Sequence, residues 1–224
     1  MKSPLPGHAV ETLSAGKAPD RAPASKQPTA HDARKWLPPV ADSFDAQLAL
    51  FRENAAALKA DFCMVGSRDE LTKYLVQRRD AEAWNNVASH TGELTNATCK
   101  SLALPVCRTD APYNVTELET CDAAITECDA LVAQFGSVLV TSRSAGGRAL
   151  SILPPHHVVL ARREQLVRDL PTAFELLKQK YGGNYPSMIS FITGPSRTGD
   201  IERILVLGAH GPKKLTILFV NEHS

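Results

Sequence analysis

Short, uninterrupted apolar runs alternate with longer segments of helical spacing along most of this chain. The strand-like runs are rich in β-branched residues and stop at glycine, proline or polar residues. Continuous apolar strands of this kind are typical of a mostly parallel sheet covered on both faces. The pattern predicts an α/β fold, a mostly parallel sheet flanked by helices. The expected strands are 62–65, 83–88, 123–126, 137–141, 157–161, 188–193, 204–207 and 214–220.

Two early segments carry clear helix-start signals. The segment 42–60 places its apolar side chains on one helical face, with Asp42 or Ser43 as the N-cap. The segment 67–79 begins with a serine and has Glu70 three positions later, which is the pattern of a capping box.

Later segments are less regular. Residues 164–180 have helical spacing, and Pro171 is expected in the first turn of a second helix. Residues 92–99 suit a short helix, whereas 102–108 are expected to be irregular.

Composition limits the classes of protein to consider. The chain has 224 residues, of which 43% are hydrophobic and 22% charged, and its formal net charge is +1. A near-zero net charge does not favour nucleic-acid binding, which needs a basic surface. No apolar run approaches the ~20 residues of a membrane span. One core domain over 39–224 is expected, in a cytoplasmic protein without a secretory signal.

Residues 1–38 are rich in Pro, Ala, Ser and Lys and contain few large apolar side chains. Such a segment buries too little surface to offset its chain entropy, so it is expected to be a flexible tail. The alternative is an extended arm, in which Trp36 and Leu37 anchor the segment on the body or on the neighbouring subunit of a homodimer.

The cysteines do not form a metal-binding pattern. No CxxC pair occurs among the five, and no GxGxxG motif follows a strand, so no metal, iron–sulfur or dinucleotide site is predicted and the cofactor stays unassigned. Reduced thiols are expected at Cys63, Cys99, Cys107, Cys121 and Cys128.

Two strand-like runs end in Gly/Pro turns that carry polar groups, and the candidate site is placed there. A guanidinium beside hydroxyls and helix-start N–H groups suits a carboxylate or phosphate. The structural alternative is that the hydroxyls only cap a helix while Arg197 pairs with Asp200 or Glu202. The predicted ligand-binding residues are Gly194, Ser196, Arg197, Thr198, Gly208 and Gly211.

His157, His210 and Asp200 are the candidate catalytic residues, because together they would form an acid–base or metal-binding set. Each histidine alone is more often a structural residue held by a hydrogen bond. His156 is expected to face solvent, and Asp129 either fixes a turn or takes part in catalysis.

The chain resembles the LutC/YkgG group of LUD-domain proteins, named for lactate utilisation, over roughly 42–222. The similarity lies in Cys-Asp at 128–129, FGSVLV at 135–140, LSILPPHH at 150–157, GPSRTGDIE at 194–202 and GAHGP at 208–212. It implies a fold like the NagB/RpiA/CoA-transferase group, a link to L-lactate oxidation, and iron–sulfur partner proteins. The family usually has an acidic residue before its Thr-Gly-Thr, where this chain has Gln134-Phe135-Gly136-Ser137.

Three functions are compatible with these observations. The first is an accessory or assembly subunit of lactate oxidation, which the resemblance favours. The second is an enzyme acting on a carboxylate, phosphate or CoA-like anion, and the third is a sensor of such an anion. In each case, the strands ending at Thr141, Thr193 and Leu207 are expected to share one sheet and to bring their turns together.

Overall fold

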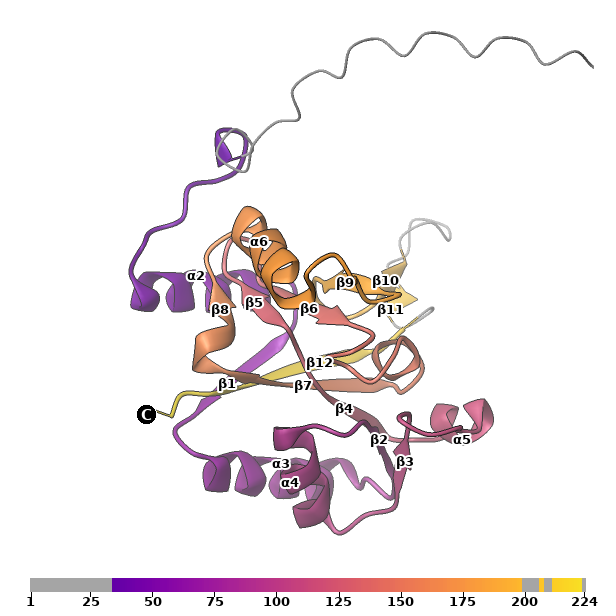
Figure 1. Cartoon of the computed structure of the whole chain (residues 1–224). Helices are drawn as coiled ribbons and strands as arrows, with labels where there is room; N and C mark the ends of the chain where they lie inside the picture. The colour runs from indigo at the N-terminus through magenta and orange to yellow at the C-terminus, as the bar shows by residue number, and fades with distance from the viewer. Residues whose placement is uncertain (1–33, 199–205, 208–210, 223–224) are drawn as a thin grey trace, which may run out of the picture.

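A six-stranded parallel sheet forms the centre of the molecule. The computed structural model describes residues 34–198, 206–207 and 211–222. All five pairings in this sheet are parallel, as the continuous apolar runs predict (Figure 1). In spatial order the strands are β1 (Asp61–Val65), β12 (Lys214–Val220), β7 (His156–Arg162), β4 (Ala123–Glu127), β2 (Val87–Ser89) and β3 (Val106–Arg108). The α/β class with a mostly parallel sheet flanked by helices is confirmed.

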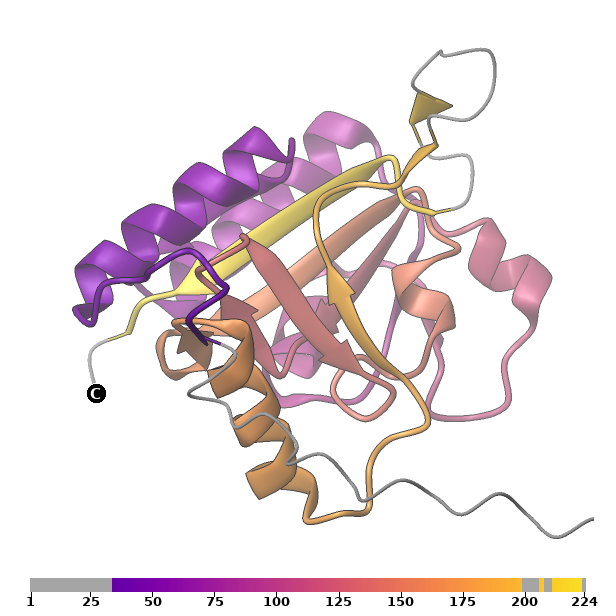
Figure 2. The same ribbon diagram turned by 90° about the horizontal axis from the view of Figure 1, so that it is seen from above.

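A four-stranded mixed sheet packs on one face of the central sheet. One apolar core joins it to helix α2 (Phe44–Ala57) and to the central strands, through residues such as Phe51, Val138, Val159 and Phe219. Its order is β8 (Leu166–Val167), β5 (Ala130–Val132), β6 (Ser137–Thr141) and β9 (Ile189–Ile192). A short hairpin of β10 (Arg197–Thr198) and β11 (Val206–Leu207) projects from one end of the molecule (Figure 2).

The helices complete the layers. A second core packs α3 and α4 against the other face of the central sheet, and a third packs α6 against the outer face of the smaller sheet. Two 3₁₀ turns, Ala149–Ser151 and Arg163–Gln165, lie in the connections. The α-helices are α2 (Phe44–Ala57), α3 (Arg68–Glu82), α4 (Glu93–Leu102), α5 (Val115–Glu119) and α6 (Leu170–Tyr181).

The predicted helix starts are present. Ser43 Oγ accepts a hydrogen bond from Ala46 N at 3.3 Å, so Ser43 rather than Asp42 caps α2. Ser67 Oγ accepts from Glu70 N at 3.2 Å, while the Glu70 carboxylate accepts from Gly66 N at 2.7 Å. In a standard capping box the glutamate accepts from the N–H of the N-cap residue, whereas Glu70 accepts from the residue before it, Gly66.

The expected strand 83–88 is shortened to 87–88, because Ala83 is the C-cap of α3 and β2 begins at Val87. Two further stretches differ from the sequence prediction. Residues 164–169 are not part of an α-helix: 164–165 lie in a 3₁₀ turn, β8 pairs with β5, and α6 begins at Leu170 with Asp169 as its N-cap and Pro171 in its first turn. Residues 106–108, expected to be irregular, pair with β2 as an edge strand. In both places a partner strand distant in sequence determines the structure.

The prediction that three strands share one sheet and bring their turns together is wrong. β6 and β9 are antiparallel neighbours, so Thr141 pairs with Ile189 and the turn after β6 lies at the opposite end from Gly194. β11 belongs to the separate hairpin. Antiparallel pairing places the carboxyl ends of two neighbouring strands on opposite edges.

The segment before α2 contacts the body through polar groups. Arg34 Nε donates to the buried Asp169 carboxylate at 2.8 Å, and Gln134 Nε2 donates to Pro38 O at 2.7 Å. Burial raises the pKa of Asp169, but the hydrogen bonds from Arg34 and Thr172 lower it to about 2. Trp36, by contrast, is 89% exposed and does not anchor the arm within one chain.

Removing residues 1–38 should therefore destabilise the body slightly, whereas removing 1–33 should not. Loss of Arg34 costs about 1–2 kcal/mol for a charged hydrogen bond, which corresponds to roughly 2–8 °C in melting temperature for a domain of this size. Thermal unfolding of the two truncations measures the difference. Trp36→Ala in the full chain is the control and should leave the melting temperature unchanged. Equal melting temperatures for both truncations would rule out the Arg34 anchor.

Candidate functional site

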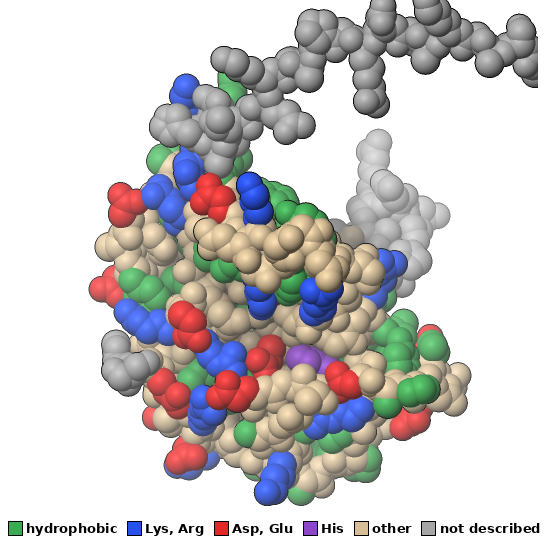
Figure 3. All heavy atoms as spheres, viewed as in Figure 1, with side chains coloured by type: hydrophobic (Ala, Val, Ile, Leu, Met, Phe, Trp, Pro, Cys, Tyr) green, Lys and Arg blue, Asp and Glu red, His purple; other side chains and the backbone are tan. Residues whose placement is uncertain are grey.

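The two edges of the central sheet carry different sets of polar residues. A cavity of about 260 Å³ lies at the carboxyl edge, where open α/β sheets commonly bind ligands. Acidic and basic side chains are interspersed on the face shown in Figure 3. The cavity is lined by Arg68, Glu93, Leu94, Arg162, Glu164, Val220 and Glu222.

The arginines of this cavity are already paired with carboxylates of the chain. Glu93 accepts from Arg68 at 2.6 Å and from Arg162 at 3.0 Å, and Arg162 also pairs with Glu127 at 3.2 Å. The hydrogen bond from Arg68 and the charge of Arg162 lower the pKa of Glu93. Glu222 Oε1 accepts from the backbone N–H of Arg68, in the first turn of α3.

A carboxylate also occupies the amino terminus of α4. Glu127 Oε1 accepts from Leu94 N at 2.8 Å and from Thr95 N at 3.3 Å. Gly92 makes this approach possible, because a Cβ at that position would lie 2.3 Å from Glu127 Oε1. With Glu127 at its rim, the cavity has four glutamates against two arginines, so a free anion is disfavoured there.

The described residues of the two predicted ligand-binding turns lie at the opposite, amino edge. Gly211 and Pro212 directly precede β12, and Ser196 N donates to Pro212 O at 2.9 Å. A Cβ at Gly211 would lie 3.0 Å from that of Ser196. The structure thus brings two of the predicted turns together, at the edge where β12 begins.

Gly194 and Arg197 both contact the end of α2. Gly194 has φ +87°, and a Cβ there would lie 2.7 Å from Leu58 O. The Arg197 guanidinium donates a hydrogen bond to the same carbonyl. Arg197 and Thr198 form strand β10, so the expectation that a helix opens here is wrong. Asp200, Gly208 and His210 lie outside the described residues.

Three exposed cations lie at or next to this contact along the chain. Arg197, Lys59 and Lys213 are exposed. Lys59 follows Leu58, and Lys213 follows Pro212, so the backbone of both lysines lies near Ser196 and Arg197. Lys213 also lines a depression of about 150 Å³ together with Glu82 and Asp122. In contrast to the carboxyl edge, no ion pair joins these three residues to an acid within the described part of the chain.

His157 is fully buried in the sheet. Its Nε2 lies 2.9 Å from Thr126 Oγ1, and burial lowers its pKa to about 3. The Nδ1 atom has no hydrogen-bond partner among the described residues. These contacts favour the structural alternative for His157, and its catalytic role stays a prediction.

His156 does not face solvent, contrary to the sequence prediction. It is 2% exposed, with Nδ1 at 3.0 Å from Glu82 and Nε2 at 2.8 Å from Thr216. Burial opposes ionisation of Glu82, but Lys214 and His156 lower the pKa of its carboxyl to about 2. A long-range partner, Glu82 at the end of α3, turns the strand start inward, and local sequence contains no signal for it.

Asp129 is buried and anchors the end of α6. Its Oδ1 accepts from Lys180 at 2.6 Å and from Tyr181 at 2.7 Å. Burial raises the pKa of Asp129, yet the hydrogen bonds that it accepts, from Lys180 first, hold it below its usual value. The contacts support a role in fixing the fold.

Sequence reasoning missed the charged residues of the carboxyl edge. Glu127 and Arg162 are the last residues of β4 and β7, and Arg68 and Glu222 follow β1 and β12 by three and two positions. A charged residue at the carboxyl end of each apolar run was the available signal. Within the described residues, no three His, Cys, Asp or Glu side chains form a metal-binding group, and no helix is long and apolar enough to cross a membrane.

The buried His157 predicts a pH dependence of stability. Its folded pKa of about 3 lies below the ordinary value of about 6.5. As pH falls below 6.5, the unfolded chain binds a proton that the folded chain does not, so stability falls until about pH 3. One proton corresponds to a slope of about 1.4 kcal/mol per pH unit.

Urea unfolding of the wild type and of His157→Asn between pH 7 and 4.5 measures this slope. The variant should be less stable at pH 7 but should show a slope smaller by nearly one proton. Equal slopes in the two proteins would contradict a neutral buried His157.

Comparison with known proteins gives a consistent assignment. The LUD domain profile matches residues 48–220. The chain is 28% identical to a "Lactate utilization protein C" of Shouchella clausii, over 80% of this chain and 81% of that protein. The proteins of the same name from Bacillus velezensis and Bacillus subtilis are 33% and 32% identical, and these alignments span 52% and 46% of their lengths.

A solved structure supports the fold. The crystal structure of a DUF162 family protein from Deinococcus radiodurans superimposes with a TM-score of 0.63 at 21% identity, covering 80% of this chain and 98% of that one. At this identity the similarity concerns the fold alone. With the domain match across most of the chain, it follows that the protein belongs to the LUD domain family.

Proposed function

We propose that this protein serves L-lactate utilisation as a LutC-like accessory or assembly subunit in the cytoplasm, together with iron–sulfur partner proteins. The observation that carries the proposal is the alignment with a lactate utilization protein C over 80% of the chain. The LUD domain match, over residues 48–220, is in line with it.

The state of the thiols supports an accessory role. Four cysteines are buried, and Cys63 is partly exposed. Burial raises the pKa of all five, that of Cys121 to about 12. Iron–sulfur clusters are bound by thiolates, and a raised pKa keeps these groups protonated. In this proposal the iron–sulfur centres belong to the partners.

The amino-edge turn is the proposed ligand site, with a small carboxylate or phosphate as ligand. Gly194, Ser196, Arg197, Thr198, Gly208 and Gly211 would form the cradle, and His210 with Asp200 would supply acid–base groups. The support is electrostatic. Arg197, Lys59 and Lys213 are exposed cations, whereas acids outnumber the arginines of the carboxyl-edge cavity. The same site would serve an enzyme or a sensor of a carboxylate, phosphate or CoA-like anion.

Expression in a Bacillus subtilis strain that lacks its lactate utilization protein C tests the function. The wild-type chain should restore growth on L-lactate and leave growth on glucose unchanged. Failure of a well-expressed, folded chain to restore growth would contradict the lactate role. Co-purification of an iron–sulfur protein from the same cells would support the accessory role, and purification of the chain alone would favour the enzyme or sensor.

Arg197→Ala tests the ligand site. Loss of a charged hydrogen bond to an anion should weaken binding by about 1.5–3 kcal/mol. Arg197→Lys should weaken it less, since the ammonium keeps the charge but not the planar fork. Thermal shift with L-lactate, pyruvate, phosphate and a CoA ester measures binding, and Lys73→Ala on α3 is a control for removal of a surface cation. A lowered melting temperature of Arg197→Ala with unchanged ligand shifts would mean that Arg197 only holds Leu58.

A further inference from the structure

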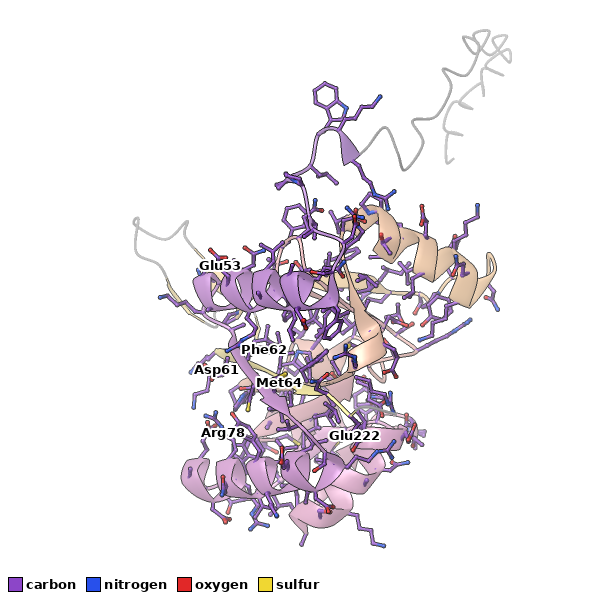
Figure 4. All side chains as sticks on the ribbon, turned by 90° about the vertical axis from the view of Figure 1, so that its left-hand side faces the viewer. Glu53, Asp61, Phe62, Met64, Arg78 and Glu222 are labelled. Atoms are coloured by element: carbon purple, nitrogen blue, oxygen red, sulfur yellow. The ribbon has the colours of Figure 1, made fainter. Side chains whose placement is uncertain are left out.

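Strand β1 is an open edge of the central sheet. It pairs with β12 on one side, and no strand of the described residues pairs with its other side. Figure 4 shows β1 exposed between α2 and α3, with Asp61, Phe62 and Met64 along it. Met64 is 46% exposed, which is unusual for a large apolar side chain at a sheet edge.

The backbone of this edge has only two outward-facing residues. Val65 O accepts from Asn221 N, so Asp61, Cys63 and Val65 direct their backbone groups toward β12. Phe62 and Met64 consequently direct theirs outward. On either side of them, Ala60 N donates to Ala55 O and Gly66 N donates to Glu70.

From this geometry we propose that β1 pairs antiparallel with β1 of a second copy of the chain, about a two-fold axis at Cys63. Phe62 of each copy then lies opposite Met64 of the other, and each such pair exchanges two backbone hydrogen bonds. This register uses both outward residues of both copies. With the axis at Phe62, Met64 would lie opposite Ala60 of the second copy, and with the axis at Met64, Phe62 would lie opposite Gly66. The N–H groups of Ala60 and Gly66 are already bonded within their own chain.

The neighbouring surface of α2 complements itself about the same axis. A depression of about 400 Å³ beside Phe62 is lined by Ala49, Ala56, Arg52 and Glu53. A two-fold axis normal to the sheet leaves both copies of α2 on the same face of the joined sheet. The same rotation reverses the direction of the helix, so the two copies of α2 run antiparallel. Arg52 then faces Glu53 of the second copy, and the reverse, which makes the contact complementary in charge.

A second copy suits this edge better than an extended peptide. A peptide would gain backbone bonds at only the two outward residues of one chain. A second copy gains the same bonds and also adds the contacts between the two α2 helices and between Phe62 and Met64. Pairing at β1 joins the two six-stranded sheets into one continuous sheet.

Cys63 reports on this arrangement directly. At the axis it lies opposite Cys63 of the second copy in a non-hydrogen-bonded pair, in which Cα atoms are about 4.5 Å apart. The other four cysteines are buried. A short reagent with two thiol-reactive maleimide groups should therefore cross-link the full-length protein into a dimer by alkylating Cys63 of both copies, and Cys63→Ser should abolish the cross-link. No cross-link in the wild type would overturn the proposal, as would an equal yield in Cys63→Ser.

Sedimentation equilibrium of charge variants tests the helix contact. Glu53→Arg, an exposed substitution, should raise the dimer Kd at least tenfold, and the double variant Arg52→Glu with Glu53→Arg should restore it. Met64→Lys should also raise the Kd at least tenfold, whereas Val115→Lys on α5 should not. Circular dichroism verifies that each variant is folded. A wild-type chain that is monomeric at all concentrations, or dimers unaffected by both Glu53→Arg and Met64→Lys, would overturn the proposal.

Discussion

The insertion of β12 between β1 and β7 is the contact on which the rest of the structure depends. Five residues of β12 pair with β1 and seven pair with β7, so without β12 the first strand has no place in the sheet. Its amino end places Pro212 and Lys213 beside Ser196 and Pro155, and its carboxyl end brings Glu222 to the amino terminus of α3. Both polar edges of the sheet are thus completed by the last strand of the chain, which must form contacts of high sequence separation before either edge exists.

The two edges illustrate how the same residue types give different chemistry. At the carboxyl edge, Glu127 and Glu222 occupy helix amino termini that would otherwise attract a ligand anion, and Glu93 neutralises two arginines. Such a network stabilises the packing of α3 and α4 against the strand ends and opposes binding of a further negative charge. At the amino edge, cations are exposed, whereas His156 and His157 are buried and burial lowers the pKa of both. This distribution of charge supports the proposed anion site at the loop that precedes β12.

Elements that depend on contacts between residues close in sequence were predicted correctly, whereas those that depend on distant partners were not. Ser43, Ser67 and Pro171 mark helix starts through contacts within a few residues, and apolar runs define the strands whatever their neighbours are. Strand order, by contrast, depends on partners far away: β9 returns antiparallel to β6, and β3 joins β2. The prediction that the turns at Gly194 and Gly211 lie close together is confirmed, but the turn after Thr141 lies elsewhere. The residues of a single strand do not indicate whether its partner runs parallel or antiparallel to it. His156 faces inward because Glu82 and Thr216 bind it, and neither is near it in sequence.

The contact between Arg197 and Leu58 changes how the structural and ligand-binding roles of Arg197 relate. A guanidinium has five N–H donors, and one donor to a carbonyl leaves the others available. Fixing the head group against α2 also removes part of the side-chain entropy that binding an anion would otherwise cost. Leu58 O is a neutral acceptor, so the positive charge of Arg197 is not compensated there. The two roles are therefore compatible: the carbonyl holds the guanidinium, and its remaining donors and its charge stay available to an anion. If both roles hold, Arg197→Ala should lower both the melting temperature and the affinity for an anion. The size of the two losses in the same variant shows how much Arg197 contributes to each role.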